Sequence, residues 1–337
     1  MNRRRWFLGV LAAVLVLVLG GTVVALVGNN YRITEERLSI PVPGGALDAV
    51  LARPEDGPAR GLVVTVHGDG PVEATHDGLY RPFFEAAADA GFATLSWSKP
   101  GIGTSSGNWL EQSMDDRAAE VSTVIDWARD RADIPTGAIA LWGASQAGWV
   151  LPAVTAVRDD IDAVVTVSPA VNWLRQGRYN LLAELDHDGA DATRRAETIA
   201  ASDHTRALLD RHADYDTYLT ETDDSPPMTA DRWGFVARNH TADATANLRA
   251  TASKHIPTLL MLAEHDRNVD IAETATTYTE LLGDDLTVEY FDAAHSLAKP
   301  AVEDSALVGL TIGLFRPRAL LADGVLDTYR HFLREQD

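Results

Sequence analysis

The sequence predicts an α/β fold in which a mostly parallel central sheet carries helices on both faces. Short apolar runs rich in Val, Ile and Leu alternate with longer helical segments over much of the 337-residue chain. This alternation is typical of βαβ units, whose crossover helices cover both faces of a parallel sheet. Several of the apolar runs, such as 61–66, have no polar alternation, as expected of strands buried on both faces.

The expected elements follow one another in regular order. Strands at 37–41 and 46–52 are joined across Pro43-Gly44-Gly45, a turn-forming cluster. The later expected strands are 61–66, 92–97, 138–142, 161–168, 257–262 and 286–291. The expected helices are 80–90, 114–131, 146–157, 271–282 and 320–334. These elements form one α/β domain over residues 31–337.

The alternation lapses between about 172 and 255, where Ala, Arg and Asp are frequent and Pro226-Pro227 breaks the chain. We expect a mostly helical insertion there, forming a cap over the active site. Its aromatic residues either line an acyl pocket or pack the insertion against the core. They are Trp173, Tyr179, Tyr215, Tyr218, Trp233 and Phe235.

The N-terminus has the pattern of a membrane segment. Three arginines, Arg3 to Arg5, precede an uncharged run of 23 residues from Trp6 to Gly28. A helix that spans a bilayer needs about 20 apolar residues, whereas a cleavable signal peptide has an apolar region of about 7–15. We therefore predict a signal anchor within residues 1–30, with the arginines cytoplasmic and the rest extracytoplasmic. The alternative is a secreted protein whose signal peptide has been cleaved.

Composition excludes several function classes. The chain has 29 Lys and Arg against 49 Asp and Glu, a net charge of −20, which argues against a nucleic-acid-binding protein. It contains no Cys, so disulfides, thiol nucleophiles and Cys-ligated metals are excluded. Glu264-His265-Asp266 has metal-ligand residue types, but adjacent side chains on a strand diverge. We therefore expect no metal site and no cofactor.

A nucleophile motif lies between a strand and a helix. Residues 140–148 read Ala-Leu-Trp-Gly-Ala-Ser-Gln-Ala-Gly, so Ser145 stands in a Gly-x-Ser-x-Ala motif where the strand turns directly into the helix. Such a strained turn exposes a serine and requires small residues two positions before and after it. Gly143 and Ala147 meet this requirement. Ser145 is therefore the predicted nucleophile, and an N-cap serine is the competing interpretation.

A glycine-rich loop follows the strand at 61–66. It reads His67-Gly68-Asp69-Gly70, and glycines allow a backbone to approach a ligand closely. An oxyanion needs two fixed backbone N–H donors. We predict these to be the N–H groups of Asp69 and Gln146, with Gly68 or Gly70 as alternatives to Asp69. His67 is expected to shape this loop through hydrogen bonds, and the Asp69 side chain to turn away from the oxyanion, towards Lys99 or a positively charged substrate group.

The general base and its carboxylate are expected after the later strands. Asp266 follows the strand at 257–262, and Asp270 is its close competitor. His295 follows the strand at 286–291, with one helix and one strand between it and Asp266. A serine nucleophile needs a histidine to accept its proton and a carboxylate to orient that histidine. The predicted catalytic residues are therefore Ser145, Asp266 and His295.

These motifs resemble those of the α/β-hydrolase superfamily, and the resemblance extends from about Arg37 to the C-terminus. Residues 98–107 are similar to the Asp-x-x-Gly-x-Gly-x-Ser segment of that family, with Ser98 in place of the usual Asp. Bacterial esterase-like and dienelactone-hydrolase-like members with a helical cap are the most similar subgroup. The resemblance implies a serine hydrolase that cleaves a carboxylic ester through an acyl-enzyme. The alternatives are a serine aminopeptidase or oligopeptidase and an inactive, membrane-tethered binding protein.

Overall fold

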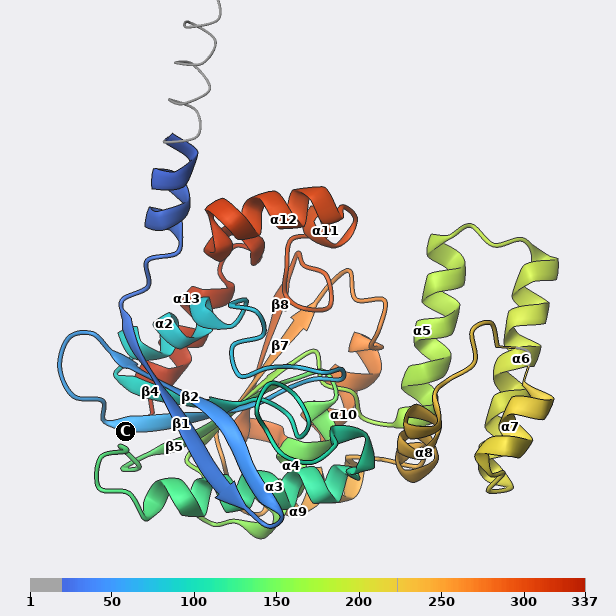
Figure 1. The fold of residues 1–337 in the computed structure, drawn as a ribbon, viewed down its shortest axis with the longest axis horizontal. Coiled ribbons are helices and arrows are strands. Elements are labelled where there is room, and N and C mark those ends of the chain that lie inside the picture. Colours follow the sequence, from blue (N-terminus) through green and yellow to red (C-terminus); the bar gives the residue numbers. More distant parts are fainter. Residues whose placement is uncertain (1–19, 223, 337) are drawn as a thin grey trace, which may run out of the picture.

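The computed structural model describes residues 20–222 and 224–336, whose strands form one eight-stranded sheet (Figure 1). Its spatial order is β1-β2-β4-β3-β5-β6-β7-β8. The strands are β1 (Ile33–Val42), β2 (Gly45–Pro54), β3 (Gly61–Val66), β4 (Phe92–Trp97), β5 (Ile139–Ala144), β6 (Ala163–Val167), β7 (Thr258–Ala263) and β8 (Leu286–Phe291). Only the β1–β2 and β2–β4 pairs are antiparallel. The predicted mostly parallel α/β sheet is confirmed.

Helices cover both faces of this sheet. They are α2 (Arg81–Asp89), α3 (Met114–Arg129), α4 (Ala147–Val157), α5 (Trp173–His187), α6 (Ala192–Asp210), α7 (Tyr215–Glu221), α8 (Ala230–Asn239), α9 (Thr245–Ala252), α10 (Ile271–Leu282), α11 (Pro300–Glu303), α12 (Ala306–Phe315) and α13 (Val325–Arg334), with 3-10 turns η1 (Trp109–Glu111), η2 (Gly283–Asp285) and η3 (Pro317–Leu320). Helices α2 and α13 share one hydrophobic core with the sheet. Helices α3, α4, α9 and α10 share the other.

Alternation along each strand divides its side chains between these two cores. On β5, Leu141 faces the α3 and α4 side, whereas Trp142 faces α2 and α13. Both side chains are almost fully buried, as expected of a central parallel strand. The sheet is therefore a rigid support, and its carboxyl edge holds the loops that follow β3, β5, β7 and β8.

The insertion between about 172 and 255 is helical, as predicted. Figure 1 shows α5, α6, α7 and α8 standing to one side of the sheet, with α6 and α7 farthest from it. Helix α9 instead packs on α4, where Thr251 Oγ1 lies 2.6 Å from Thr155 Oγ1. Helices α5 to α8 together form the arm. Helix α9 is not part of the arm, because it belongs with the helices that cover the sheet.

The C-terminal segment differs most from expectation. One helix was expected over 320–334, but the chain forms η3 and then α13, with Gly324 in the left-handed region at φ 88° between them. Helices α11 and α12 were not predicted. The run Ala306–Phe315 contains no charged residue and no polar stripe, so it lacks the periodic pattern from which a helix is predicted.

The predicted N-terminal anchor falls mostly outside the described residues. Of the run from Trp6 to Gly28, only residues 20–28 are described, and they are helical. In the described ranges, no helix combines the length and the apolar composition needed to cross a bilayer.

Candidate active site

The loop after β3 lies directly against the turn after β5. Val66 pairs with Gly143 in parallel register, so residues 67–71 run beside the turn at Ser145. A Cβ added to Gly68 would stand only 3.3 Å from the Cβ of Ser145. The sequence-predicted oxyanion loop and nucleophile are therefore in contact.

The turn at Ser145 has the geometry of a nucleophile elbow. Ser145 has φ 54°, in the left-handed region that a non-glycine residue rarely adopts. A Cβ at Gly143 would lie 2.7 Å from the Cβ of Ala147, and one at Gly148 would lie 2.5 Å from the Ala170 carbonyl oxygen. Glycine is therefore required at 143 and 148, whereas position 147 accommodates alanine.

Two backbone donors next to Ser145 are available to a ligand. Among the described residues, neither the Asp69 N–H nor the Gln146 N–H donates a hydrogen bond within the chain. The Gly68 carbonyl, which belongs to the same peptide unit as the Asp69 N–H, accepts a hydrogen bond from Lys99 Nζ at 2.5 Å. Because carbonyl and N–H point in opposite directions in a trans peptide, Lys99 fixes the Asp69 N–H facing away from itself.

Two further cations hold the same loop. Arg117 of α3 donates to the His67 carbonyl at 2.6 Å and to Gln146 Oε1 at 2.5 Å. Arg232 of the arm makes a bidentate pair with the Asp69 carboxylate at 3.0 and 2.7 Å, and Gln146 Nε2 donates to Asp69 at 3.0 Å. The Asp69 side chain is therefore held by Arg232 and Gln146, whereas Lys99 or a positively charged substrate group was expected as its partner.

The environment of these groups shifts their pKa values. Burial, reinforced by Arg117, holds the pKa of Lys99 well below its ordinary value. Burial also lowers the pKa of Arg117 to about 10. For Asp69, burial alone would raise the pKa, but the hydrogen bonds and charge of Arg232 outweigh it and the pKa falls below its usual value. The loop is therefore surrounded by three cationic side chains, of which Lys99 and Arg117 are buried.

His67 has a structural environment. Its Nε2 lies 2.7 Å from the Trp97 carbonyl oxygen, and its ring is 2 % exposed. Burial and the nearby Lys99 charge lower the pKa of His67 to about 3, so the ring is neutral. The expectation that His67 shapes the loop rather than acting as the base agrees with this geometry.

Asp266 and His295 form a hydrogen-bonded pair. Asp266 Oδ2 lies 2.8 Å from His295 Nδ1, and the Asp266 side chain is completely buried. Asp266 Oδ1 accepts hydrogen bonds from the N–H groups of Asn268 and Val269 at 2.8 and 2.9 Å. The competitor Asp270 instead caps α10, accepting from the N–H groups of its first turn. Of the two carboxylates, only Asp266 is in contact with His295.

The arm contacts the loop that carries Asp266. Tyr179 of α5 donates its hydroxyl to the Asp266 carbonyl at 3.0 Å, and Asn180 and Gln176 bind the next two carbonyls. Other aromatic residues of the arm stack on neighbouring rings. Tyr218 stacks on Trp233 with 4.2 Å between ring centroids, and Trp173 stacks on Trp149.

A cavity of about 580 Å³ is lined by residues next to Ser145 and next to His295. Its lining includes Ala144, which precedes Ser145, and Ser296, which follows His295. The six aromatic residues of the insertion considered above do not line it. The Ser145 hydroxyl makes no hydrogen bond to any described residue. Among those residues, no group of three His, Cys, Asp or Glu side chains is arranged to hold a metal ion.

Fold and site together define a serine hydrolase of the α/β-hydrolase superfamily. Residues 57–299, more than half of the chain, match the family described as serine aminopeptidase, S33, and the chain belongs to that family. No curated protein matches it in sequence.

Solved structures share the fold. An esterase from Pyrococcus furiosus superposes with a TM-score of 0.54 at 14% identity, over 84% of this chain and 92% of that one. Est1E from Butyrivibrio proteoclasticus, solved with ferulic acid, gives 0.55 at 18% identity, over 88% and 96%. An acylaminoacyl peptidase from Pyrococcus horikoshii gives 0.52 at 14% identity, over 90% of this chain and 41% of that one.

The residues that sequence reasoning missed are those that support the site from elsewhere in the chain. Arg117 and Arg232 carry no local motif, and each reaches its partner across 29 or more residues. Charged residues usually lie on the solvated surface, and this chain contains many of them. Neither arginine could therefore be distinguished from a surface residue. The capping box at Ser113 and Asp116 was a readable signal, since it fixes the start of α3 and so the face on which Arg117 lies.

Proposed function

We propose that this protein hydrolyses carboxylic esters through an acyl-enzyme, with Ser145 as nucleophile, His295 as general base and Asp266 as the carboxylate that orients His295. The proposal depends above all on the Asp266–His295 pair and on the strained turn at Ser145. Ser296, next to His295, and Ala144, next to Ser145, line the same cavity. His295 Nδ1 is held by Asp266, so its other ring nitrogen is left to accept the serine proton.

The reaction proceeds in two balanced steps. The Ser145 oxygen attacks the acyl carbonyl while its proton passes to His295, and the N–H groups of Asp69 and Gln146 bind the oxyanion. The ester bond then breaks, and the alcohol leaves with the proton from His295. In the second step, water gives a proton to the same imidazole and attacks the acyl carbon. The bond from that carbon to the Ser145 oxygen then breaks, His295 returns the proton to this oxygen, and the acid is released.

Amide hydrolysis is the second candidate, because the chain belongs to a family described as serine aminopeptidase. A substrate amine would need a free carboxylate near the site. The arm carboxylates Glu184, Asp186 and Asp188 are each paired with an arginine. Asp69 is likewise paired with Arg232. This neutralisation argues against these four carboxylates as the group that would bind a substrate amine.

We also propose that residues 1–30 anchor the chain in a membrane with the hydrolase domain extracytoplasmic. The apolar run from Trp6 to Gly28 and the preceding arginines support this location. Membrane fractionation of the full chain tests it. Recovery in the membrane pellet after carbonate washing is expected, whereas release with an N-terminus near Asn29 would indicate a cleaved signal peptide.

Labelling by a fluorophosphonate probe tests the nucleophile. The full chain should label, and Ser145→Ala should lose both the label and the turnover of p-nitrophenyl butyrate. Persistent labelling in that variant would place the nucleophile elsewhere. A folded wild-type chain that does not label would support the inactive binding protein instead. Comparing p-nitrophenyl butyrate with alanine p-nitroanilide separates ester from aminopeptidase activity.

A further inference from the structure

Helix α12 presents an apolar face to solvent. Leu307, Leu310 and Leu314 are 74, 70 and 54 % exposed, and their spacing places them on one side of the helix. Soluble proteins rarely expose a contiguous leucine stripe without a partner that covers it. The chain segments that lie beside α12 indicate which partner covers its leucines.

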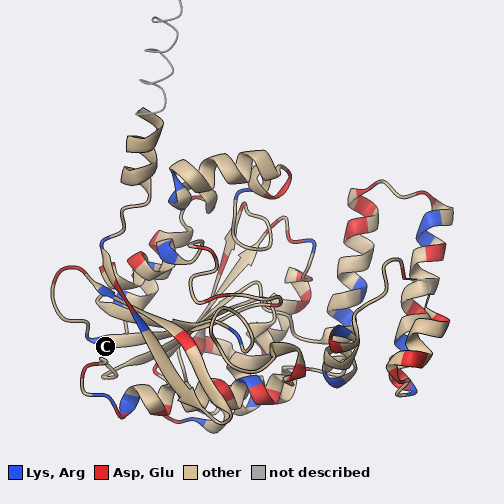
Figure 2. Cartoon of the chain, viewed as in Figure 1, with Lys and Arg blue, Asp and Glu red and all other residues tan. Residues whose placement is uncertain are grey.

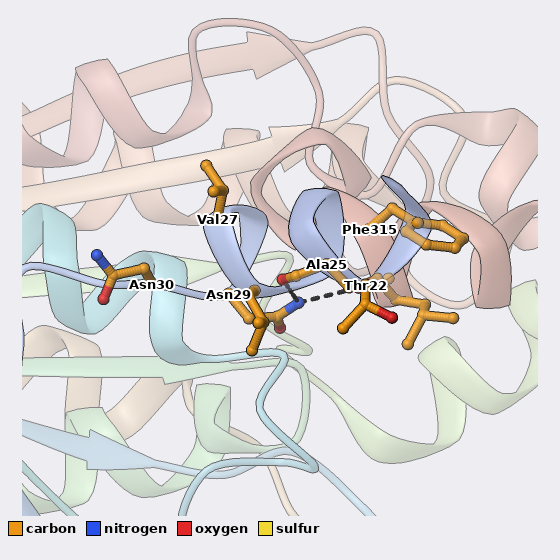
Figure 3. Close-up of a pocket in the computed structure, with 10 residues that line it drawn as sticks. Thr22, Ala25, Val27, Asn29, Asn30 and Phe315 are labelled. Atoms are coloured by element: carbon orange, nitrogen blue, oxygen red, sulfur yellow. Dashed lines mark hydrogen bonds between the residues drawn. The ribbon is translucent and has the colours of Figure 1, made fainter. Parts of the chain in front are cut away.

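The chain enters the domain next to α12. Asn29 Nδ2 donates to the Leu314 carbonyl at 2.9 Å, and it also binds the Ala25 carbonyl (Figure 3). A Cβ added to Gly21 would lie 3.6 Å from the Phe315 ring. The end of α12 is therefore level with residues 21–29, which are the last part of the apolar run that begins at Trp6.

An arginine fixes this arrangement to the domain. Arg318 donates to the carbonyls of Gly28 and Asn30 at 2.7 and 2.8 Å. It also pairs with Glu85 of α2 at 2.6 and 2.8 Å. Figure 1 shows α12 running across the side of the domain from which the N-terminal segment leaves.

The charges of this side suit a lipid surface. Figure 2 shows α12 without acidic or basic residues, whereas α3, α5 and α6 carry many. Arg316 follows the helix and is exposed, where it can meet lipid phosphates. Exposed leucines on an uncharged helix, next to the proposed membrane anchor, place α12 where it can bury its apolar surface in a lipid interface.

Helix α12 also forms one wall of the cavity next to the proposed active site. Gly309, Leu310, Gly313 and Leu314 line it from α12, while Trp142 and Ala144 line it from the sheet. Its volume of about 580 Å³ lies within the 300–1,000 Å³ typical of ligand sites. It therefore connects the exposed face of α12 to the residues that flank Ser145 and His295.

We infer that α12 rests in the lipid interface and that the cavity beneath it holds the acyl chain of a membrane-resident ester, which enters from the bilayer. The inference rests on the proposed esterase function for its chemistry. It adds the substrate class, an ester with a long acyl chain, and the side from which that substrate arrives.

A site-directed label tests the docking without any measurement of activity. The chain has no cysteine, so Leu307→Cys takes an environment-sensitive NBD dye at one place. Val157→Cys is the matched control, because Val157 is also 74 % exposed but lies at the end of α4. The full chain is reconstituted into vesicles of phosphatidylethanolamine and phosphatidylglycerol, with or without doxyl-labelled lipid.

We expect a blue-shifted emission at position 307 that doxyl lipid quenches at least twofold, and neither effect at 157. Water-like emission at 307 would overturn the inference. A blue shift without quenching would also overturn it, since it would mean that protein, such as a second copy of this chain, covers α12.

The cavity is tested by the acyl-chain profile. Transfer of a methylene from water contributes up to about fourfold in kcat/KM, so activity should rise steeply from p-nitrophenyl butyrate to the decanoate. Gly313→Leu adds a side chain at this wall of the cavity, where the nearest atom to a Cβ is 3.7 Å away. It should lower the ratio of decanoate to butyrate activity at least tenfold.

Gly177→Leu on α5 is the control, because a Cβ there meets no atom within 4 Å. This variant should leave the activity toward both esters unchanged. A flat profile in the wild type, or equal effects of Gly313→Leu on both esters, would overturn the cavity assignment. If the wild type neither hydrolysed p-nitrophenyl butyrate nor reacted with the fluorophosphonate probe, the proposed function itself would be wrong.

Discussion

Replacing Asp266 by Asn tests the base assignment most sharply, because the surrounding hydrogen bonds determine how the new amide must sit. Oδ1 of Asp266 accepts two backbone N–H groups, so the amide oxygen of Asn takes that position. The amide NH2 then faces His295 Nδ1, where Oδ2 stood at 2.8 Å. It donates to that nitrogen and forces the ring proton onto Nε2, so His295 can no longer accept a proton from Ser145.

The expected loss follows from this wrong tautomer. The equivalent change in a serine-protease triad lowers kcat by about 10⁴, which corresponds to about 5 kcal/mol in the activation free energy. We expect Asp266→Asn to lose three to four orders of magnitude in kcat for p-nitrophenyl butyrate, with a smaller change in KM.

Asp270→Asn is the matched control. Asp270 caps α10 by accepting from the N–H groups of Ala272 and Glu273 at 3.0 and 3.1 Å. Asn caps helices about as well as Asp, so the free energy of unfolding should change by only about 0.5 kcal/mol or less. Its kcat should stay within twofold of the wild type. If Asp266→Asn kept a tenth of the activity, or Asp270→Asn lost as much as Asp266→Asn, the assignment of the carboxylate would be wrong.

Three other changes are predicted. Gly148→Ala places a Cβ 2.5 Å from the Ala170 carbonyl oxygen, and we expect a loss of about 1–3 kcal/mol in the free energy of unfolding by urea, together with reduced kcat. Lys99→Met removes the bond that holds the Gly68 carbonyl, so kcat should fall at least tenfold with little change in KM; an unchanged kcat would show that Lys99 does not orient the Asp69 N–H. The pKa of His67 is about 3 in the folded chain and about 6.5 when unfolded, so the unfolded state binds one more proton between these values. The stability contributed by neutral His67 is complete above pH 6.5 and is lost as the pH falls towards 3, by up to about 1.4 kcal/mol per pH unit. Urea unfolding measured from pH 7 to 4.5 should show this slope in the wild type but not in His67→Gln.

The parts of the fold that the sequence predicted are those specified by neighbouring residues. The strand at 61–66 is a run of apolar residues without polar alternation, and it is buried along its whole length. The expected limits of α10, 271–282, agree with the structure because Asp270 caps it and a glycine follows it. The turn at Ser145 was also readable, since its small neighbours and the flanking strand and helix lie within a few residues.

The parts that were missed depend on residues far apart in the chain. The segment that forms α12 is apolar on all sides and has no polar stripe. Its hydrophobic periodicity therefore could not indicate a helix. Arg232 reaches Asp69 across 163 residues, and no local pattern indicates that pair. Of the two alternatives left open for the aromatic residues of the insertion, the structure favours packing, since Tyr218 stacks on Trp233 and Trp173 on Trp149. The cavity beside α12 is lined by other residues.

The placement of cations in this acidic chain agrees with an oxyanion at the loop after β3. Lys99 and Arg117 are 3 and 6 % exposed, and burial lowers both pKa values, so the folded state is less stable for containing them as cations. Such a cost is explained where the charges act on a reaction. Both side chains hold carbonyl oxygens of the loop, and in a medium of low dielectric constant both add positive potential at the proposed oxyanion site. Their burial beside this loop therefore agrees with the proposed reaction at Ser145, by an argument that does not use the Asp266–His295 pair.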